Sequence, residues 1–165
     1  DVVLALFLLG QRFELEEKKR NFDYYEKITT HDSSLSECIF SIVASDIGYH
    51  DKAYQYFLDS IRMDLDNLQG NTSAGNHIAN MAGSWMMVIN GFAGMRVYDD
   101  VLSFKPHLPK EWNEYSFKIT YRGKVVKLTI NQQGTKYELL EGDELAILHN
   151  GEERILKNIY PALIC

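Results

Sequence analysis

The sequence predicts an α+β protein, in which helical hairpins come first and a small antiparallel β-sheet or sandwich follows. Up to about Met95 the apolar residues recur every three to four positions, as on an amphipathic helix, and beyond it the spacing shortens toward two, as on a strand. The charge changes at the same place, from 13 acidic and 7 basic residues in 1–95 to 10 of each in 96–165. We therefore predict two domains with these boundaries.

The composition excludes several classes of protein. With 45% hydrophobic and 24% charged residues, the chain is globular rather than disordered. Its net charge of −6 repels nucleic acids and acidic membrane surfaces, so neither is expected as a partner.

Cys38 and Cys165 lie far apart without a CxxC pattern, which predicts neither a zinc site nor a disulfide framework and favours a cytoplasmic protein. Residues 2–9 form an apolar run that is too short to span a membrane and is expected to be a buried element.

Periodic apolar stripes predict four helices in the first domain. They are expected over residues 15–28, 35–47, 53–61 and 78–89. Gly48 is expected to end the second helix and Asp51 to cap the third, while a charged EEKKR run lies on the solvated face of the first. In the last helix, the face toward the core is predicted to carry Ile78, Met81, Ala82, Trp85, Met86 and Ile89.

Two hairpin turns organise the predicted β domain. Residues 117–121 and 125–130 alternate on either side of Arg122-Gly123, with a change of phase that allows a β-bulge. Further strands are expected over residues 136–140, 145–148 and 154–156. Asn150-Gly151 separates the last two and is a favoured dipeptide in two-residue hairpin turns.

The segment ITTHDSSLSE, residues 28–37, is the most informative stretch for chemistry. Its hydroxyls stand directly before a predicted helix, whose N-terminal N–H groups and dipole attract anions. Ser33 or Ser34 could instead only cap that helix, with Glu37 completing a capping box from Ser34. The residues alone favour capping and leave an anion site as the alternative.

A second polar loop, NTSAGNH at residues 71–77, precedes the helix predicted over residues 78–89. It places His77 at a helix N-terminus, where a nearby anion would favour the protonated ring. A single histidine at such a position more often caps or packs, so both interpretations stay open. If the two loops face one site, their chemistry suits phosphate.

Other candidates are weaker. Asp23 and Glu26 stand beside a charge run and are expected on the surface rather than as an acid and base pair. Cys38 lies on an apolar stripe and is expected to be an inert core thiol. Trp85 is expected in the core, with the floor of a sugar site as the alternative. No P-loop, dinucleotide fingerprint, nucleophile elbow or HExxH motif occurs.

Several longer stretches together resemble one enzyme family. They are RNFDYYEKITTHDSSLS, GYHDKAYQYFLDSIRMDLDN, GNHIANMAGSW, GFAGMRVYDDVLSFKPHLPKEW and YSFKITYRG. On these stretches the chain is similar to the C-terminal portion of glycoside hydrolase family 65, the maltose, kojibiose and trehalose phosphorylases, and most similar to the maltose phosphorylase branch. The likeness runs from Asp1 to about Asn131.

The resemblance implies a fold and a reaction. This family has an (α/α) barrel of six helical hairpins followed by a C-terminal β domain, so the chain would supply the last hairpins and that domain. Its members cleave α-linked glucose disaccharides with inversion. Inorganic phosphate attacks the anomeric carbon, a glutamic acid protonates the leaving oxygen, and β-glucose 1-phosphate is released. The resemblance implies no cofactor and no metal, with phosphate as a substrate.

The resemblance also assigns residues to the site. Ser33 and Ser34 of HDSSLS and His77 of GNHIANMAG match the family's phosphate-binding positions, and His31 stands beside them as a further member. Asn76 departs from the apolar residue expected before that histidine. The family's catalytic glutamate belongs to a segment upstream of this chain, which is therefore expected to carry no catalytic residue and to be inactive alone.

Two other functions stay open beside the phosphorylase. A hydrolase relative such as a trehalase would share the fold, although a hydrolase needs no paired serines to cradle phosphate. A helical repeat module with a β appendage would bind proteins and would not respond to anions. The expected partners are phosphate, an α-glucose disaccharide, the remainder of the same enzyme, and a second copy of the chain through residues 2–9. The resemblance favours maltose and leaves trehalose and kojibiose open.

Overall fold

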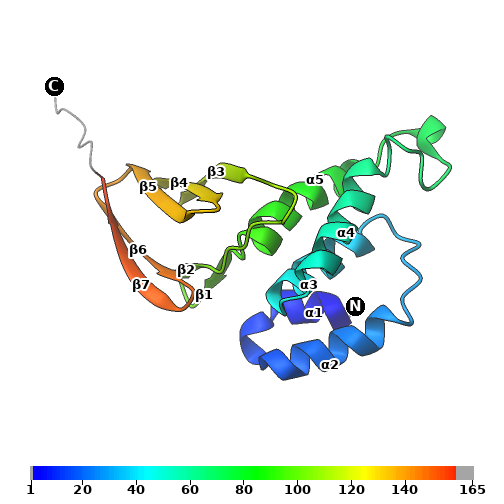
Figure 1. Cartoon of the computed structure of the whole chain (residues 1–165), viewed down its shortest axis with the longest axis horizontal. Helices are drawn as coiled ribbons and strands as arrows, with labels where there is room; N and C mark the ends of the chain where they lie inside the picture. Colours follow the sequence, from blue (N-terminus) through cyan, green and yellow to red (C-terminus); the bar gives the residue numbers. More distant parts are fainter. Residues whose placement is uncertain (1, 159–165) are drawn as a thin grey trace. The chain divides into compact units, whose positions relative to one another are not determined.

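Helices make up the first unit of the chain and strands make up the second (Figure 1). The computed structural model describes residues 2–158. The boundary between its two units falls between Gly94 and Met95. The predicted α+β class, with helical hairpins before the sheets, is confirmed.

All four helices predicted from the sequence are present. The helical unit contains, in chain order, α1 (Val2–Leu8), the 3₁₀ turn η1 (Gly10–Arg12), α2 (Leu15–Glu26), α3 (Ser36–Asp46), α4 (His50–Arg62), the 3₁₀ turn η2 (Thr72–Ala74), α5 (Ile78–Met86) and the π-helix η3 (Met87–Phe92). Asp51 does not cap α4 as predicted, because the helix begins at His50 and Tyr49 occupies the N-cap, two residues before Asp51.

Gly48 ends α3 as predicted, and the reason is its left-handed backbone. Its φ is 87°, a conformation that costs glycine little. The Tyr49 N–H donates to the Ala44 carbonyl at 2.8 Å, and the Gly48 N–H donates to the Ser45 carbonyl at 3.1 Å. This pair of bonds is the Schellman motif, which satisfies the last carbonyls of a helix.

Two glycines let α5 and η3 lie close against α3. A Cβ on Gly83 would stand 3.0 Å from the Cβ of Cys38, and one on Gly91 would stand 3.3 Å from the Ser45 hydroxyl. Cys38 lies in the first turn of α3 and Ser45 in its last, so the two helical segments run side by side in the same direction. The N-terminal ends of α3 and α5 therefore lie at the same end of this unit.

Most of the face that was predicted to meet the core is exposed in α5, so the prediction is wrong there, whereas Ile89 in η3 is buried as predicted. Ile78 is 76% exposed and Trp85 57%, whereas Asn80, Gly83 and Met87 are buried. The helix turns its glycine toward α3, because a side without a Cβ allows the closest approach between two backbones.

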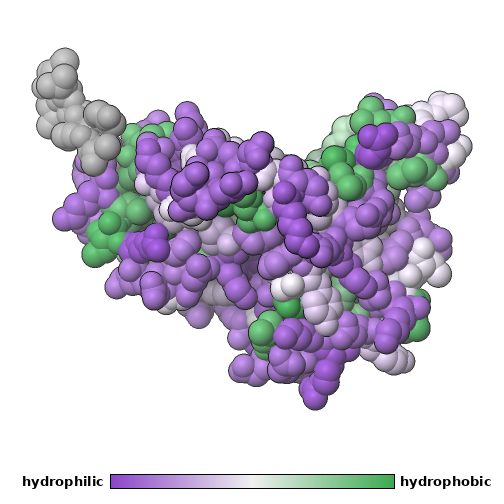
Figure 2. All heavy atoms as spheres, viewed as in Figure 1, coloured by the Kyte–Doolittle hydropathy of each residue, from purple (hydrophilic) through white to green (hydrophobic). Residues whose placement is uncertain are grey.

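Apolar side chains also remain exposed elsewhere on the helical unit. In α1, Val3 and Leu6 are buried but Leu8 is 60% exposed, so the predicted buried element is buried on one face only. Ile61 of α4 and Leu65 beyond it are exposed as well. Figure 2 shows apolar surface gathered over the end of α4 and the loop that follows it, at the upper right.

The β unit holds two sheets that face each other as a small sandwich. Its strands are β1 (Arg96–Tyr98), β2 (Val101–Phe104), β3 (Glu114–Tyr121), β4 (Lys124–Asn131), β5 (Gly134–Glu141), β6 (Glu144–His149) and β7 (Glu152–Lys157). One sheet has the order β1-β2-β6-β7 and the other β3-β4-β5. The ring centroids of Phe104 and Tyr137, one from each sheet, lie 5.5 Å apart.

The predicted hairpin turns and the bulge are confirmed. Arg122-Gly123 joins β3 to β4 and Asn150-Gly151 joins β6 to β7, all four residues having a positive φ. The bulge falls at Val125, where β4 pairs with β5. The sheets are not wholly antiparallel as predicted, because β2 and β6 pair in parallel. In the chain, these two strands are separated by the three strands of the other sheet, β3 to β5. Strands β1 and β2 were not predicted, because they are too short to show an alternation.

Candidate anion-binding site

Two polar loops lie at one end of the helical unit, before α3 and before α5 (Figure 1). The first holds Ser33 and Ser34, and the second ends at His77. The backbone of Gly83 lies against Cys38, and the serines precede Cys38 by about as many residues as His77 precedes Gly83. Since α3 and α5 run in the same direction, the two loops lie at about the same position along the helix axes. The residues expected to bind phosphate therefore share one end of the helices.

The first loop offers hydroxyls that are only loosely held. Ser33 is exposed, and its Oγ accepts a hydrogen bond of 3.3 Å from the Leu35 N–H. Within residues 2–158, the half-buried hydroxyl of Ser34 has no hydrogen-bond partner. The N–H of Ser36, the first residue of α3, donates to the Ser33 carbonyl at 3.0 Å. Both serine hydroxyls are thus able to turn toward an anion in front of the helix.

The predicted capping box does not form. Leu35 occupies the N-cap of α3 without a side-chain hydrogen bond, so neither serine of the pair caps the helix. The Oε2 of Glu37 is buried and, in the part of the chain described, has no partner. Burial, and secondarily the charge of Asp59, raises the pKa of Glu37 to about 7. Near pH 7 the Glu37 carboxyl is therefore partly protonated, and it repels an incoming anion less than an ionised carboxylate would.

His31 is held by partners inside the helical unit. Its Nδ1 lies 2.9 Å from the Ser36 hydroxyl and its Nε2 lies 3.5 Å from the Tyr56 hydroxyl. The ring also packs against Phe40, with the centroids 4.6 Å apart. Burial lowers the pKa of His31, an effect that the charge of Glu26 opposes. A neutral ring with both nitrogens engaged supports the loop, whereas the resemblance implies that it binds the anion.

Glu26 connects this support to α4. Its Oε1 accepts hydrogen bonds from Lys52 Nζ at 2.6 Å and from the Tyr56 hydroxyl at 3.2 Å, and the bond from Lys52 lowers the pKa of Glu26. Asp23 accepts a hydrogen bond of 3.2 Å from the Tyr49 hydroxyl. The two carboxylates therefore bind α4 and the residue before it, rather than standing free on the surface as predicted.

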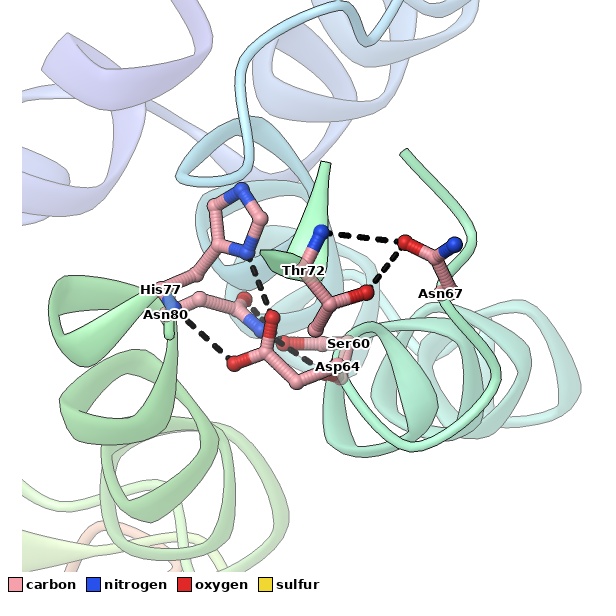
Figure 3. Close-up of polar contacts among 6 residues, drawn as sticks. All are labelled: Ser60, Asp64, Asn67, Thr72, His77 and Asn80. Atoms are coloured by element: carbon pink, nitrogen blue, oxygen red, sulfur yellow. Dashed lines mark hydrogen bonds and ion pairs between the residues drawn. The ribbon is translucent and has the colours of Figure 1, made fainter. Parts of the chain in front are cut away.

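Asp64 fixes His77 at the start of α5 (Figure 3). Its Oδ2 accepts the backbone N–H of His77 at 2.9 Å, and its Oδ1 lies 2.6 Å from the ring Nδ1. These hydrogen bonds lower the pKa of Asp64 and keep it ionised. The other ring nitrogen, Nε2, points away from Asp64 in Figure 3, so it is the atom that His77 offers to a ligand.

Further hydrogen bonds hold the elements around this contact (Figure 3). The Ser60 hydroxyl donates to the Asn80 Oδ1 at 2.6 Å, and the Asn80 Nδ2 donates to the Ser60 carbonyl at 2.7 Å. In the loop between α4 and α5, the N–H and the hydroxyl of Thr72 both donate to the Oδ1 of Asn67. In the sequence Asp64 only follows the helix predicted over residues 53–61, and no local signal shows that it reaches His77.

Two cavities border the loops. One of about 330 Å³ is lined by apolar residues of α1 and α3 together with Ser33 and Ser36. Another of about 250 Å³ lies between α4 and α5 and is lined by Asp64 and Asn80 among others. The structure thus brings the two loops to one end of the helices, while Ser33 and Asp64 border separate cavities.

Other expectations concern metals, thiols and membranes. Within residues 2–158, no group of three His, Cys, Asp or Glu side chains is placed to hold a metal ion. Cys38 is a buried free thiol whose pKa is raised to about 11 by burial, which fits an inert core residue, and Cys165 lies outside the described residues. None of the described helices has the length and apolar character needed to cross a membrane.

Helical hairpins with polar loops at the N-terminal ends of parallel helices, followed by a β-sandwich, are the order of elements that the resemblance implies for the last hairpins of a barrel domain and its C-terminal domain. Comparison with known proteins identifies the family. Residues 1–86 match the model of the glycosyl hydrolase family 65 central catalytic domain, and residues 95–156 match that of the family 65 C-terminal domain. The chain therefore belongs to glycosyl hydrolase family 65, as the resemblance predicts.

Named relatives of the chain include disaccharide phosphorylases. It is 49% identical to the alpha,alpha-trehalose phosphorylase of Thermoanaerobacter brockii, over 95% of this chain and 20% of that protein. It is 43% identical to the maltose phosphorylase of Bacillus subtilis (strain 168), over 88% of this chain and 19% of that protein. A solved structure described as a kojibiose phosphorylase from the human microbiome matches with a TM-score of 0.91 at 34% identity, over 96% of this chain and 21% of that one. The chain spans about a fifth of the length of the curated relatives it matches.

Proposed function

We propose that this chain contributes the phosphate-binding part of a family 65 disaccharide phosphorylase. The observation that carries the proposal is that two polar loops share the N-terminal end of parallel helices, with an oriented imidazole at one of them. Ser33, Ser34, the first N–H groups of α3 and the Nε2 of His77 together hold one phosphate. That phosphate attacks the anomeric carbon of an α-linked glucose disaccharide with inversion, giving β-glucose 1-phosphate.

The polar groups of the site suit phosphate better than water. An inverting hydrolase needs a carboxylate base that deprotonates water. A phosphate dianion is already a nucleophile, so it needs only positioning, which hydroxyls, N–H groups and an imidazole provide. The Asp64 carboxylate is occupied by His77 and the Glu37 Oε2 is buried, so neither is presented as a base. These observations favour a phosphorylase over a trehalase-type hydrolase.

The proton donor of the proposed reaction lies elsewhere. A general acid has to come within about 2.6–3.2 Å of the glycosidic oxygen, on the side opposite the phosphate. Near the loops, Glu26 is paired with Lys52 and Asp64 with His77. We propose that a carboxylic acid outside this chain protonates the leaving oxygen, and that the 165-residue chain alone shows no turnover.

Maltose is the substrate that we propose first, following the resemblance. Trehalose is the direct competitor, because two trehalose phosphorylases share 49% and 48% identity with this chain. Both sugars carry an α-linkage, so the same phosphate site serves either reaction. Assaying a complete enzyme that contains this chain with maltose, trehalose and kojibiose decides between them.

The proposed site is tested by phosphate binding to the purified chain, measured by calorimetry or by amide NMR. We expect salt-sensitive binding, and a loss of affinity of roughly ten-fold or more in the double variant S33A/S34A, because a hydrogen bond to a charged group contributes about 1.5–3 kcal/mol. Ser84→Ala is the matched control, since within the described part of the chain that hydroxyl bonds only to the Asn80 carbonyl of its own helix, at 3.0 Å. If the double variant binds phosphate as tightly as the wild type, the two serines do not hold the anion.

A further inference from the structure

We propose that Asp64 is a positioning residue of this site, which holds the backbone and the ring of His77 together so that Nε2 is directed at the bound phosphate. The identity of the ligand rests on the proposed function. The orientation of the ring by Asp64 does not, because it depends only on contacts within the chain.

The Asp64 carboxylate leaves the ring of His77 one orientation. Oδ2 binds the backbone N–H at 2.9 Å and Oδ1 faces Nδ1 at 2.6 Å, so both oxygens engage the same residue. An ionised carboxylate only accepts hydrogen bonds, hence Nδ1 must carry its proton. The remaining nitrogen, Nε2, lies on the far side of the ring from Asp64 (Figure 3).

The same contact makes a carboxylate tolerable beside an anion. An unpaired aspartate at this place would repel phosphate. The Asp64 side chain is only 14% exposed and is paired with the ring, and the hydrogen bonds from His77 hold its pKa below the usual value. When Nε2 donates a hydrogen bond to phosphate, the carboxylate on the opposite side binds Nδ1–H and keeps the ring in place, as carboxylates do for other functional histidines.

Asp64 is itself firmly placed. It follows Met63, which is buried at the end of α4. One turn earlier, the buried Ser60 and Asn80 join α4 to α5 through two hydrogen bonds of 2.6 and 2.7 Å. The two elements that carry Asp64 and His77 are therefore fixed to each other. Such a rigid support is needed if one side chain is to orient another toward a ligand.

Asp64→Asn tests the proposal, because it keeps the shape of the side chain and removes one acceptor. In asparagine one of the two carboxylate oxygens becomes an NH₂ group, which only donates, so with the side chain in the same position one bond breaks or the ring changes tautomer. We expect the chain to bind phosphate roughly ten-fold more weakly or worse, and the ring ¹⁵N signals of His77 to change. Loss of a nearby negative charge alone predicts the opposite, a gain in affinity.

Asp66→Asn is the matched control. It removes the same charge two positions along the chain, where the carboxylate pairs with Arg62 at 2.5 and 2.7 Å and not with His77. Because that pair is exposed, its loss is expected to change phosphate affinity by less than about two-fold. An equal loss of binding in both variants contradicts a specific role for Asp64.

A double-variant cycle shows whether Asp64 acts through His77. H77A is expected to weaken phosphate binding at least as much as D64N, and D64N/H77A no further than H77A alone. A further loss in the double variant, or ring signals that stay unchanged in D64N, overturns the proposal. The wild-type chain gives a check that needs no variant, because ¹⁵N signals showing an unprotonated Nδ1 also overturn it.

These measurements separate the two proposals. If the wild-type chain binds no phosphate, the proposed function fails, and the ring signals of His77 still decide whether Asp64 orients it. If phosphate binds and D64N leaves both the affinity and the ring signals unchanged, the proposed function stands and Asp64 has no positioning role.

Discussion

Polar side chains at the proposed site differ in the hydrogen bonds that they already make. Those with few bonds can bind phosphate, and those with several hold the loops in place. Among the described residues, Ser34 is unbonded, Ser33 is weakly bonded, and His77 is bonded through Nδ1 but not through Nε2. His31, by contrast, has a partner near each of its ring nitrogens. The first three therefore retain capacity for phosphate, and the fourth holds the loop against α3 and α4.

Replacing Glu37 by Gln should remove one source of pH dependence from the stability of the chain. The pKa of Glu37 is raised from 4.5 to about 7 on folding, so the folded state keeps a proton that the unfolded state releases between these values. The stability that this retained proton gives to the folded state is therefore fully present below about pH 4.5 and is lost as the pH rises through about 7.

We expect Glu37→Gln to be more stable than the wild type near pH 8, by on the order of 1 kcal/mol once solvent screening of a half-buried group is allowed for. The two proteins should be about equally stable near pH 4. Urea unfolding at both pH values measures the difference. A difference that does not change with pH contradicts the buried, uncompensated carboxyl.

At the scale of elements, local signals were sufficient to predict some helix ends and hairpin turns, but not the residues that cap the starts of α3 and α4. Gly48 ends α3 and Asn150-Gly151 turns β6 into β7 because these residues adopt a positive φ within their own segment. The end of α3 and the turn before β7 depend on few neighbours, and both were predictable from the sequence.

Features that depend on distant neighbours were not predictable in this way. Periodicity shows that Ile78 and Trp85 share a face of α5, but not whether another element covers it. The contact of Asp64 with His77 depends on how the chain returns after α4, and nothing in MDLDN distinguishes Asp64 from Asp66. The parallel pairing of β2 with β6 likewise joins two strands that are separated in the chain by the whole β3–β5 sheet.

The close contact of α5 with α3 predicts a strong effect of Gly83→Val. Even a Cβ at this position would stand 3.0 Å from the Cβ and 3.1 Å from the Sγ of Cys38, so the larger side chain must push the helices apart. We expect a loss of about 1–3 kcal/mol, as for other overpacked cores, measured by urea unfolding.

Ala82→Val is the control for that experiment. Ala82 is the exposed neighbour of Gly83 in the same helix, so valine there carries the helix-propensity cost of a branched side chain without the clash. We expect a change of less than about 0.7 kcal/mol. Similar losses in both variants would show that α5 does not approach α3 closely.

At the scale of the whole molecule, the exposed apolar residues of the helical unit predict self-association. Leu8 of α1 is 60% exposed, and apolar surface of this kind is removed from water when two copies meet. We expect sedimentation to show dimers or larger species, and Leu8→Glu to shift them toward the monomer. Leu65→Glu, at an exposed residue beyond α4, should have a smaller effect if α1 forms the contact. A chain that stays monomeric at high concentration contradicts this expectation.

The most direct test of the account is a crystal structure of the chain soaked in phosphate. We predict one anion at the N-terminal ends of α3 and α5, bonded to the hydroxyls of Ser33 and Ser34 and to the Nε2 of His77, while Asp64 stays bonded to the Nδ1 of His77. An anion bound only at other residues, or no anion in front of these two helices, would contradict the claim that the two loops form a phosphate site.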